Sequence, residues 1–273
     1  MVGTVAVIGA GVIGGAIVKC LQESDEVEKV IATRRSLEAL KALKELGAEV
    51  TTDNRVAARK ADLIILCVKP NDVAPVLKEI KEEIEGKLVI STAAIIPLEY
   101  YNDAVPGARY VRSMPNIAAL ASESFTAYAC DPKVTTGDKA TVKVLLDTMG
   151  TSVEVEEKYM DAVTGLSGSA PAFVAIVIDA LMFAGLKVGL PRELSLRSAA
   201  QSVLGAAKLV LDGTMKPTEI AEMVTTPGGT TIDGIYEIED GKLRTALMNA
   251  VEAATKKSAN MRYMWKNSDQ RSC

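Results

Sequence analysis

Two segments rich in glycine or hydroxyl groups could bind anions, and they lie near opposite ends of the chain. The first is Gly9-Ala10-Gly11-Val12-Ile13-Gly14, and the second is Thr225-Thr226-Pro227-Gly228-Gly229-Thr230-Thr231. Each precedes a run with helical periodicity. Because the first N–H groups of a helix have no partner within the helix, such a start binds carboxylates and phosphates. Two such sites predict a cofactor and an anionic substrate.

The first segment has the context of a dinucleotide-binding turn. It follows the apolar run Val5–Ile8 and opens an amphipathic helix, as the pattern Gly-x-Gly-x-x-Gly requires. The first glycine makes the turn, the second admits the pyrophosphate, and the third lets helix and strand pack closely. An ordinary glycine-rich turn between a strand and a helix is the alternative.

The residues after the next expected strand bear on the choice of cofactor. NAD-specific domains usually place an acidic residue there, whereas this chain has Arg34 and Arg35. Guanidinium groups suit a 2′-phosphate, to which they donate charge-assisted hydrogen bonds. We therefore predict a preference for NADP(H), with NAD(H) as the second cofactor. Two solvated surface arginines are the alternative.

Short runs rich in Val and Ile alternate with helical patterns through the first half of the chain. The expected strands are 4–8, 29–32, 49–51, 63–68, 88–93 and 108–113, with two further short ones at 125–129 and 152–154. The expected helices between them are 14–23, 36–46, 54–60, 73–84, 97–102 and 137–149. This alternation, with nearly continuous apolar strands, predicts a parallel sheet covered by helices on both faces.

The pattern becomes helical after residue 157, in segments 159–166, 171–188, 191–211, 216–224, 230–239 and 242–263. We predict an α/β Rossmann-like N-terminal domain with a parallel-rich sheet (1–157), an all-α C-terminal domain for substrate binding and dimerisation (158–265), and a polar tail (266–273). The helices 171–188 and 191–211 carry more apolar surface than a small domain can hide, which favours a homodimer interface. Packing inside the monomer is the alternative.

Composition narrows the function. The chain has no histidine, which removes the usual acid–base residue and the commonest metal ligand, so we expect no metal site. Its scattered cysteines, Cys20, Cys67, Cys130 and Cys273, are typical of reduced thiols in the cytoplasm. A net charge of −4 without a basic stripe argues against nucleic acid. Charges within the most apolar segment, 172–190, argue against a membrane span.

Three short segments stand at expected strand ends, where open α/β sheets bind ligands: Cys67-Val68-Lys69-Pro70, Ser91-Thr92-Ala93-Ala94 and Met114-Pro115-Asn116. Together with residues 161–169, which end in Ser167-Gly168-Ser169, and with Pro227-Gly228-Gly229-Thr230-Thr231, they give the chain a resemblance to the pyrroline-5-carboxylate reductase family. The resemblance runs from about residue 4 to residue 258.

This resemblance implies reduction of Δ1-pyrroline-5-carboxylate to L-proline with NAD(P)H, the last step of proline synthesis. It also implies an interlocked homodimer, which many members assemble into a ring of dimers. The cofactor would bind at Gly9, Ala10, Gly11, Val12, Ile13, Gly14, Arg34, Arg35, Asn54, Val68, Lys69, Pro70, Ala93, Ala94 and Asn116. The substrate carboxylate would bind at Thr226, Gly229, Thr230 and Thr231, and the catalytic candidates are Thr230, Thr231 and Ser169.

The chain departs from the family pattern at Ala170, where glycine is common, and at Phe173, where tyrosine is common. Ile117 and Ala118 also replace a usual Thr-Pro. These changes leave a six-membered cyclic imine acid open as the substrate. The imine would arrive protonated, or take its proton through water or a hydroxyl near Thr231, Ser169 or Thr164.

Two other functions stay open at this point. A β-hydroxyacid dehydrogenase shares the order of domains and generally needs a catalytic lysine, but Lys187 and Lys208 stand without a supporting motif. A catalytically silent NADP-binding regulator is the second, although it has no need of a carboxylate site.

Overall fold

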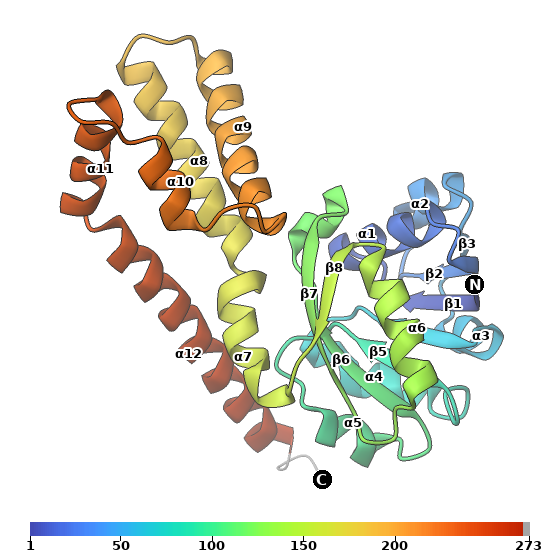
Figure 1. The fold of residues 1–273 in the computed structure, drawn as a ribbon. Helices are drawn as coiled ribbons and strands as arrows, with labels where there is room; N and C mark the ends of the chain where they lie inside the picture. Colours follow the sequence, from blue (N-terminus) through green and yellow to red (C-terminus); the bar gives the residue numbers. More distant parts are fainter. Residues whose placement is uncertain (270–273) are drawn as a thin grey trace. The chain divides into compact units, whose positions relative to one another are not determined.

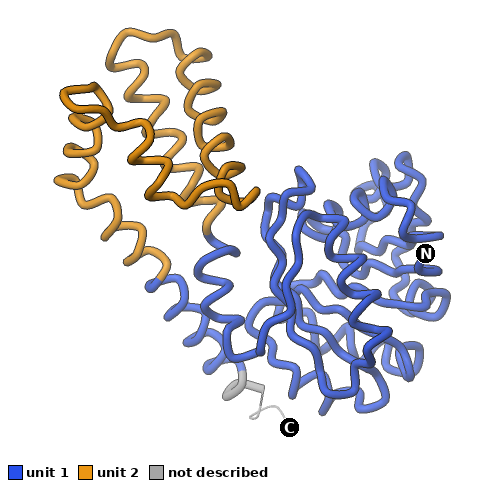
Figure 2. Tube along the Cα trace, in the orientation of Figure 1, with its two compact units in different colours: residues 1–169, 252–273 blue, residues 170–251 orange. Residues whose placement is uncertain are grey.

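The structure is a computed structural model that describes residues 1–269, and side chains as far as residue 265. It divides into two compact units (Figure 2). Unit 1 comprises Met1–Ser169 together with the chain from Glu252 onward, and unit 2 comprises Ala170–Val251.

Unit 1 is built on an eight-stranded sheet with the order β3-β2-β1-β4-β5-β6-β7-β8 (Figure 1). Its strands are β1 (Val2–Ile8), β2 (Val27–Thr33), β3 (Glu49–Thr51), β4 (Leu63–Leu66), β5 (Leu88–Ser91), β6 (Arg109–Met114), β7 (Ser124–Cys130) and β8 (Gly150–Glu154). The strands from β3 to β6 pair in parallel, β7 runs antiparallel to β6, and β8 is parallel to β7. The predicted Rossmann-like fold with a parallel-rich sheet is therefore confirmed.

Helices cover both faces of this sheet. The α-helices of the sheet region are α1 (Val12–Gln22), α2 (Lys41–Glu45), α3 (Asn54–Lys60), α4 (Pro70–Ile80), α5 (Leu98–Ala104), α6 (Thr136–Asp147) and α7 (Met160–Val163). Short 3-10 helices are η1 (Glu38–Leu40), η2 (Ile117–Ala121) and η3 (Glu157–Tyr159), and η4 (Thr164–Gly168) is a π-helix.

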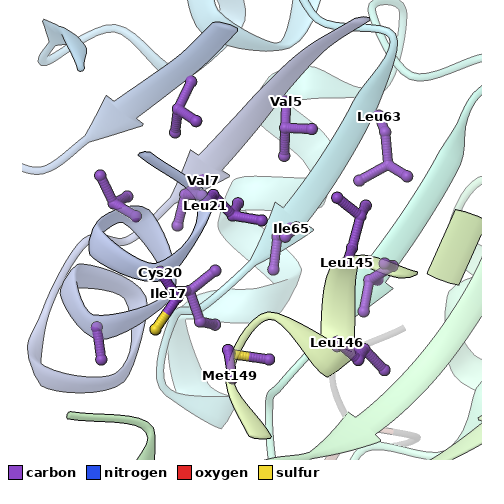
Figure 3. Packing of buried hydrophobic residues seen from close by; sticks show 14 of the residues in the cluster. Val5, Val7, Ile17, Cys20, Leu21, Leu63, Ile65, Leu145, Leu146 and Met149 are labelled. Carbon is purple, nitrogen blue, oxygen red and sulfur yellow. The ribbon is translucent and has the colours of Figure 1, made fainter. Parts of the chain in front are cut away.

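Two hydrophobic clusters form the core on either side of the sheet. Val5 and Val7 of β1 pack with α1 and α6, as Figure 3 shows with Ile17 and Leu145. The alternate side chains of β4, Ile64 and Leu66, pack with α4 and α5 on the other face. Because both faces are covered, every residue of β4 is buried. This explains the continuous apolar runs in the sequence.

The ends of several helices differ from those predicted. Residues 36–46 form η1 and the short α2 instead of one helix. The predicted end of that segment is confirmed, since Gly47 has φ +98° and the Ala48 N–H donates to the Leu43 carbonyl. α4 begins at Pro70, three residues before the expected start, because proline fits the first turn of a helix.

Unit 2 contains α8 (Ala170–Lys187), α9 (Arg192–Leu211), α10 (Pro217–Met223), α11 (Thr230–Asp240) and the first part of α12 (Leu243–Asp269). A left-handed glycine, Gly189, ends α8, and the Leu190 N–H donates to the Gly185 carbonyl. Gly185 also lets α8 approach α9, because a Cβ there would lie 2.8 Å from the Cβ of Ser195.

Much of the apolar surface of unit 2 is exposed in the single chain. Ile176 and Phe183 of α8 are 68% and 53% exposed, and Leu211 of α9 is 82% exposed. Among the described residues, α10 and α11 bury no side chain. The segment from Glu157 to Lys187 is long and apolar enough to cross a membrane by length and composition alone. A face of this kind requires either lipid or another protein surface to cover it.

The sequence pattern predicted a domain boundary between residues 157 and 158, whereas the tertiary contacts place the first boundary between units after Ser169. Residues 158–169 and the second part of α12 belong to unit 1, because Met160 is buried in its core and Asp161 accepts hydrogen bonds from Ser258 and Arg262. Trp265 meets the Tyr100 ring edge-on. Of the predicted polar tail, residues 266–269 continue α12, and residues 270–273 lie outside the described residues.

One buried residue has a strained backbone. Ile95, in the loop between β5 and α5, has φ +67° and is 7% exposed. A left-handed conformation is unfavourable for a β-branched residue, because its Cβ crowds the following carbonyl. The strain persists because the surrounding packing fixes this loop.

Replacing Ile95 by Gly or by Ala removes the same side-chain packing, but only glycine removes the Cβ that strains the backbone. We expect Ile95→Gly to be more stable than Ile95→Ala by about 1 kcal/mol. Denaturant unfolding of the two variants measures the difference. An alanine variant as stable as the glycine variant would contradict the strain.

Candidate functional site

A pocket of about 420 Å³ opens at the carboxyl ends of β1, β2 and β4. This is the place where the strand order reverses direction, and open α/β sheets bind ligands there. The lining residues come from these strand ends and from α3 and α4: Ile8, Gly9, Gly11, Thr33, Arg34, Arg35, Thr52, Asn54, Cys67, Val68, Lys69, Asp72, Pro75, Val76 and Glu79.

The glycine turn closes one side of this pocket. Gly9 has φ +92°, and a Cβ on it would lie 2.7 Å from Val68 Cγ1. A Cβ on Gly14 would lie 2.5 Å from the Gly9 carbonyl oxygen. At Gly11, by contrast, a Cβ would meet no described atom within 4 Å. Gly9 and Gly14 are therefore required by packing, whereas Gly11 faces open space.

The first turn of α1 has free donors beside that open space. Gly11 is its N-cap and makes no side-chain hydrogen bond to the helix, and the first turn contains no acidic residue. Unpaired N–H groups and the positive end of the helix dipole both favour a bound phosphate. A turn of this geometry can accept a pyrophosphate.

Charged and polar side chains gather at the end of the pocket formed by β2, α3 and α4. Arg35 pairs with Asp72 of α4, with 3.1 Å between Nη2 and Oδ2. Asn54 accepts a hydrogen bond from the Thr33 hydroxyl (2.6 Å) and donates to Glu79 Oε2 (2.9 Å). Within the described part of the chain, Arg34 has no ion-pair partner. This end can hold either a phosphate or a hydroxyl group.

The segment after β4 forms the wall opposite α1. Val68 and Lys69 line the pocket, while Pro70 opens α4 with Lys69 as its N-cap. Burial raises the pKa of the Cys67 thiol to about 12. The thiol therefore stays neutral at physiological pH and adds no negative charge beside a bound anion.

A buried hydrogen-bond network fixes the loop that carries Ala93 and Ala94. The Ala93 N–H donates to Ser91 Oγ, which lies 2.6 Å from the Tyr101 hydroxyl. Burial raises the pKa of Tyr101, which keeps this hydroxyl neutral. Ala93 is buried and Ala94 half-buried, and neither lines the pocket of about 420 Å³.

The far end of the same loop is fixed by a distant carboxylate. Glu157 accepts hydrogen bonds from the first N–H of α5, on Leu98, and from the buried Arg112. The loop is thus held at both ends, by Ser91 at its start and by Glu157 at its close. Such fixed backbone can position a ligand precisely enough for chemistry.

Three predicted polar residues near η4 already have local partners. The Asn116 side chain caps η2 by accepting from the Ala118 N–H and donates to the Ser167 carbonyl. The Ser169 and Thr164 hydroxyls donate to the carbonyls of Thr164 and Met160. Their oxygen lone pairs stay available as acceptors, but their protons are engaged in these bonds.

The segment in which the sequence predicts a second anion site forms the start of α11 in unit 2. Gly229 is the N-cap of α11 and makes no side-chain hydrogen bond to it, so the first N–H groups have no cap. Gly228 has φ +67°, and a Cβ on Gly229 would overlap the Thr226 hydroxyl. Thr230 is exposed and Thr231 half-buried. This turn presents both backbone donors and hydroxyls.

The structure brings some of the predicted cofactor residues together in the pocket: Gly9, Gly11, Arg34, Arg35, Asn54, Val68 and Lys69. The others are not in its lining: Ala10, Val12, Ile13, Gly14, Pro70, Ala93, Ala94 and Asn116. Sequence reasoning missed Asp72, Val76 and Glu79. Their spacing of four and then three residues places them on one face of α4, a signal that the helical period could have given.

The fold and the glycine-lined pocket define a dinucleotide-binding oxidoreductase of the Rossmann type. The model for the family described as "NADP oxidoreductase coenzyme F420-dependent" matches residues 4–95. The model for "Pyrroline-5-carboxylate reductase dimerisation" matches residues 157–261. A pyrroline-5-carboxylate reductase from Methanosarcina acetivorans is 44% identical over 93% of this chain and 96% of its own length. The chain belongs to the pyrroline-5-carboxylate reductase family.

Solved structures agree with this assignment. The Coxiella burnetii pyrroline-5-carboxylate reductase has a TM-score of 0.87 with 30% identity, covering 94% of this chain and 97% of that one. The Plasmodium falciparum pyrroline carboxylate reductase, solved with NADP bound, has a TM-score of 0.86 with 29% identity, covering 95% and 98%. A Mycobacterium tuberculosis 3-hydroxyisobutyrate dehydrogenase shares the fold alone, at 16% identity over 70% of this chain and 67% of that one and a TM-score of 0.54. The match to a dimerisation model supports a homo-oligomer.

Placing a methyl group at Gly11 separates folding from cofactor binding. Because this position faces open space, Gly11→Ala should cost far less stability than Gly9→Ala, whose Cβ would collide with Val68. We expect Gly11→Ala to raise the KM for NADPH at least about tenfold, or about 1.4 kcal/mol of binding free energy. Thermal unfolding and steady-state kinetics measure the two effects. An unchanged KM would exclude Gly11 from the pyrophosphate site.

Proposed function

We propose that the chain catalyses the NADP(H)-dependent reduction of Δ1-pyrroline-5-carboxylate to L-proline, the last step of proline synthesis. The observation that carries this function is the 44% identity to a pyrroline-5-carboxylate reductase over nearly the whole of both chains. The geometry of the α1 turn supports it independently, since it forms an anion site at the switch point of the sheet. NAD(H) is the second cofactor that the same pocket accepts.

The residues of the pocket fit NADP(H). The open space at Gly11 and the uncapped start of α1 would hold the pyrophosphate, and Arg34 would hold the 2′-phosphate. The loop at Ala93 and Ala94, fixed through Ser91 and Glu157, would hold the nicotinamide end. When bound, the cofactor supplies the hydride that reduces the C=N bond.

The substrate carboxylate would bind at the start of α11. The uncapped N–H groups and the hydroxyls of Thr230 and Thr231 are donors suited to an anion, with Thr226 and Gly229 shaping the turn. This turn belongs to unit 2, whereas the cofactor pocket belongs to unit 1. We propose that the homodimer completes the active site, with helices of one subunit beside the Rossmann cleft of its partner.

The proton on the ring nitrogen has to come from the substrate, from water or from a hydroxyl, because the chain has no histidine. The Thr164 and Ser169 hydroxyls donate to backbone carbonyls and are fixed as acceptors. A protonated imine could donate its N–H to such an oxygen. Ser169 therefore fits the role of an acceptor that orients the iminium better than that of an acid.

The apolar helices of unit 2 suit a dimer interface in a soluble protein better than a membrane span. α8 carries Asp179 and Lys187 within its apolar length, and charges inside a spanning helix are costly. The homodimer could assemble further into a ring of dimers. We place the enzyme in the cytoplasm, where scattered free thiols stay reduced.

The function is tested by following the NADPH concentration with three substrates: two imines, whose reduction consumes NADPH, and a hydroxy acid, whose oxidation would form it. We expect turnover with pyrroline-5-carboxylate, slower turnover with its six-membered homologue, and none with a 3-hydroxy acid when NADP⁺ is supplied. The comparison of the two imines is the most informative, because Ala170 and Phe173 depart from the family pattern and leave the preferred ring size open. Oxidation of the hydroxy acid without reduction of either imine would identify a β-hydroxyacid dehydrogenase instead.

Thr231 provides a sharper test of the carboxylate site. We expect Thr231→Ala to lower kcat/KM for the imine by about tenfold or more, because a hydrogen bond to a charged group is lost. The KM for NADPH should change less than about twofold, since the cofactor binds elsewhere. Thr231→Ser keeps the hydroxyl and serves as the matched control. Equal loss in both variants, or none in either, would remove this hydroxyl from the site.

A further inference from the structure

The end of the pocket formed by β2, α3 and α4, where the adenosine of the cofactor would bind, contains two carboxylates as well as two arginines. Asp72 and Glu79 both lie on α4 and line the pocket together with Arg34 and Arg35. A site that served only to bind a 2′-phosphate would gain nothing from negative charge, because like charges repel at short range. These carboxylates therefore call for a role of their own.

The two carboxylates are held in different ways. Asp72 pairs with the Arg35 guanidinium. Glu79 instead accepts from the uncharged Asn54 amide, which also accepts from Thr33. Removing the charge of Asp72 would release an arginine, whereas removing the charge of Glu79 would release only an amide. The structure thus offers a matched pair of acidic residues in one pocket.

Arg35 is the more exposed partner of its ion pair. Its side chain is 90% exposed, while that of Asp72 is 39% exposed. Asp72 lies in the first turn of α4, where the helix dipole favours a carboxylate. A solvent-exposed pair is weak and easily exchanged. A dianionic phosphate nearby can therefore compete with Asp72 for Arg35.

We propose that Asp72 is a specificity-determining residue, which withholds Arg35 from the 2′-phosphate and so moderates the preference for NADPH over NADH. The inference rests on the proposed use of NADP(H). With NADPH, Arg35 must leave or share Asp72 before it can donate to the phosphate. With NADH, the ribose has a hydroxyl at that position and the ion pair stays intact. Arg34, which has no such competitor among the described residues, supplies the remaining preference.

Binding of two small probes to the full-length protein tests the proposal without turnover. Adenosine 2′,5′-bisphosphate carries the 2′-phosphate, and 5′-AMP lacks it. By isothermal titration calorimetry, we expect Asp72→Asn to tighten binding of the bisphosphate by about two- to fivefold, as for the loss of one exposed competing ion pair. Its affinity for 5′-AMP should stay the same. The ratio of kcat/KM for NADPH to that for NADH should rise in parallel.

A double-mutant cycle separates the effect of the Arg35–Asp72 ion pair from the general effect of removing a negative charge. In an Arg35→Gln background, Asp72→Asn should tighten binding of the bisphosphate no more than Glu79→Gln does, because the part of its gain that runs through Arg35 is lost. Glu79→Gln removes an equal charge within the pocket and should keep its effect in that background. Glu82→Gln, which removes a carboxylate paired with Arg55 outside the pocket, controls for net charge.

Two results would overturn the proposal: unchanged bisphosphate affinity in Asp72→Asn, or the same gain with and without Arg35. Asp72→Ser removes the same charge and replaces Asp72→Asn if the latter lowers the Tm. The proposed function has its own test, which does not depend on Asp72: it fails if the wild-type protein does not reduce pyrroline-5-carboxylate. In that event a shift in probe affinity would still establish the role of Asp72.

Discussion

The close approach of three chain segments at Gly9 and Gly14 governs the geometry of the pocket at the switch point of the sheet. The end of β1, the start of α1 and the end of β4 meet there at distances that leave no room for a Cβ. Because α1 can begin so near the strands, its unpaired N–H groups face the pocket without being covered by the chain. Cys67 and Val68, which make this contact, also line the pocket.

The parts of the site that sequence could predict are those built from consecutive residues. The turn from Gly9 to Gly14 and the strand-end arginines occupy fixed places in a known supersecondary unit, so their positions follow from the order of elements. The helical period places Asp72 and Glu79 on one face of α4, but whether that face meets the strand ends depends on how Val73, Leu77 and Ile80 pack. The strain at Ile95 also escapes prediction, since an isoleucine gives no local sign of a left-handed backbone. The roles of Asn116 and Ser169 depend on partners from other elements.

Apolar segments differ in burial between the two units. β4 is buried on both faces within its own chain, whereas α8, which is also predominantly apolar, is largely exposed in the single chain. Hydrophobicity measures the free energy of leaving water and contains no information on which surface does the covering. The sequence therefore predicts that α8 must be covered, and the match of residues 157–261 to a dimerisation model is the observation that favours a second copy as the cover.

The path of α12 has a consequence for how the protein forms during synthesis. Unit 2 is an insertion in unit 1, because the chain leaves unit 1 after Ser169 and returns at Glu252. Domains generally fold as their residues emerge from the ribosome, N-terminal first. The sheet can form early, but Asp161 and Tyr100 must wait for Arg262 and Trp265, which emerge after the whole of unit 2. The first unit to begin folding is thus the last to be completed, and a chain released a few turns early would lack its closing contacts.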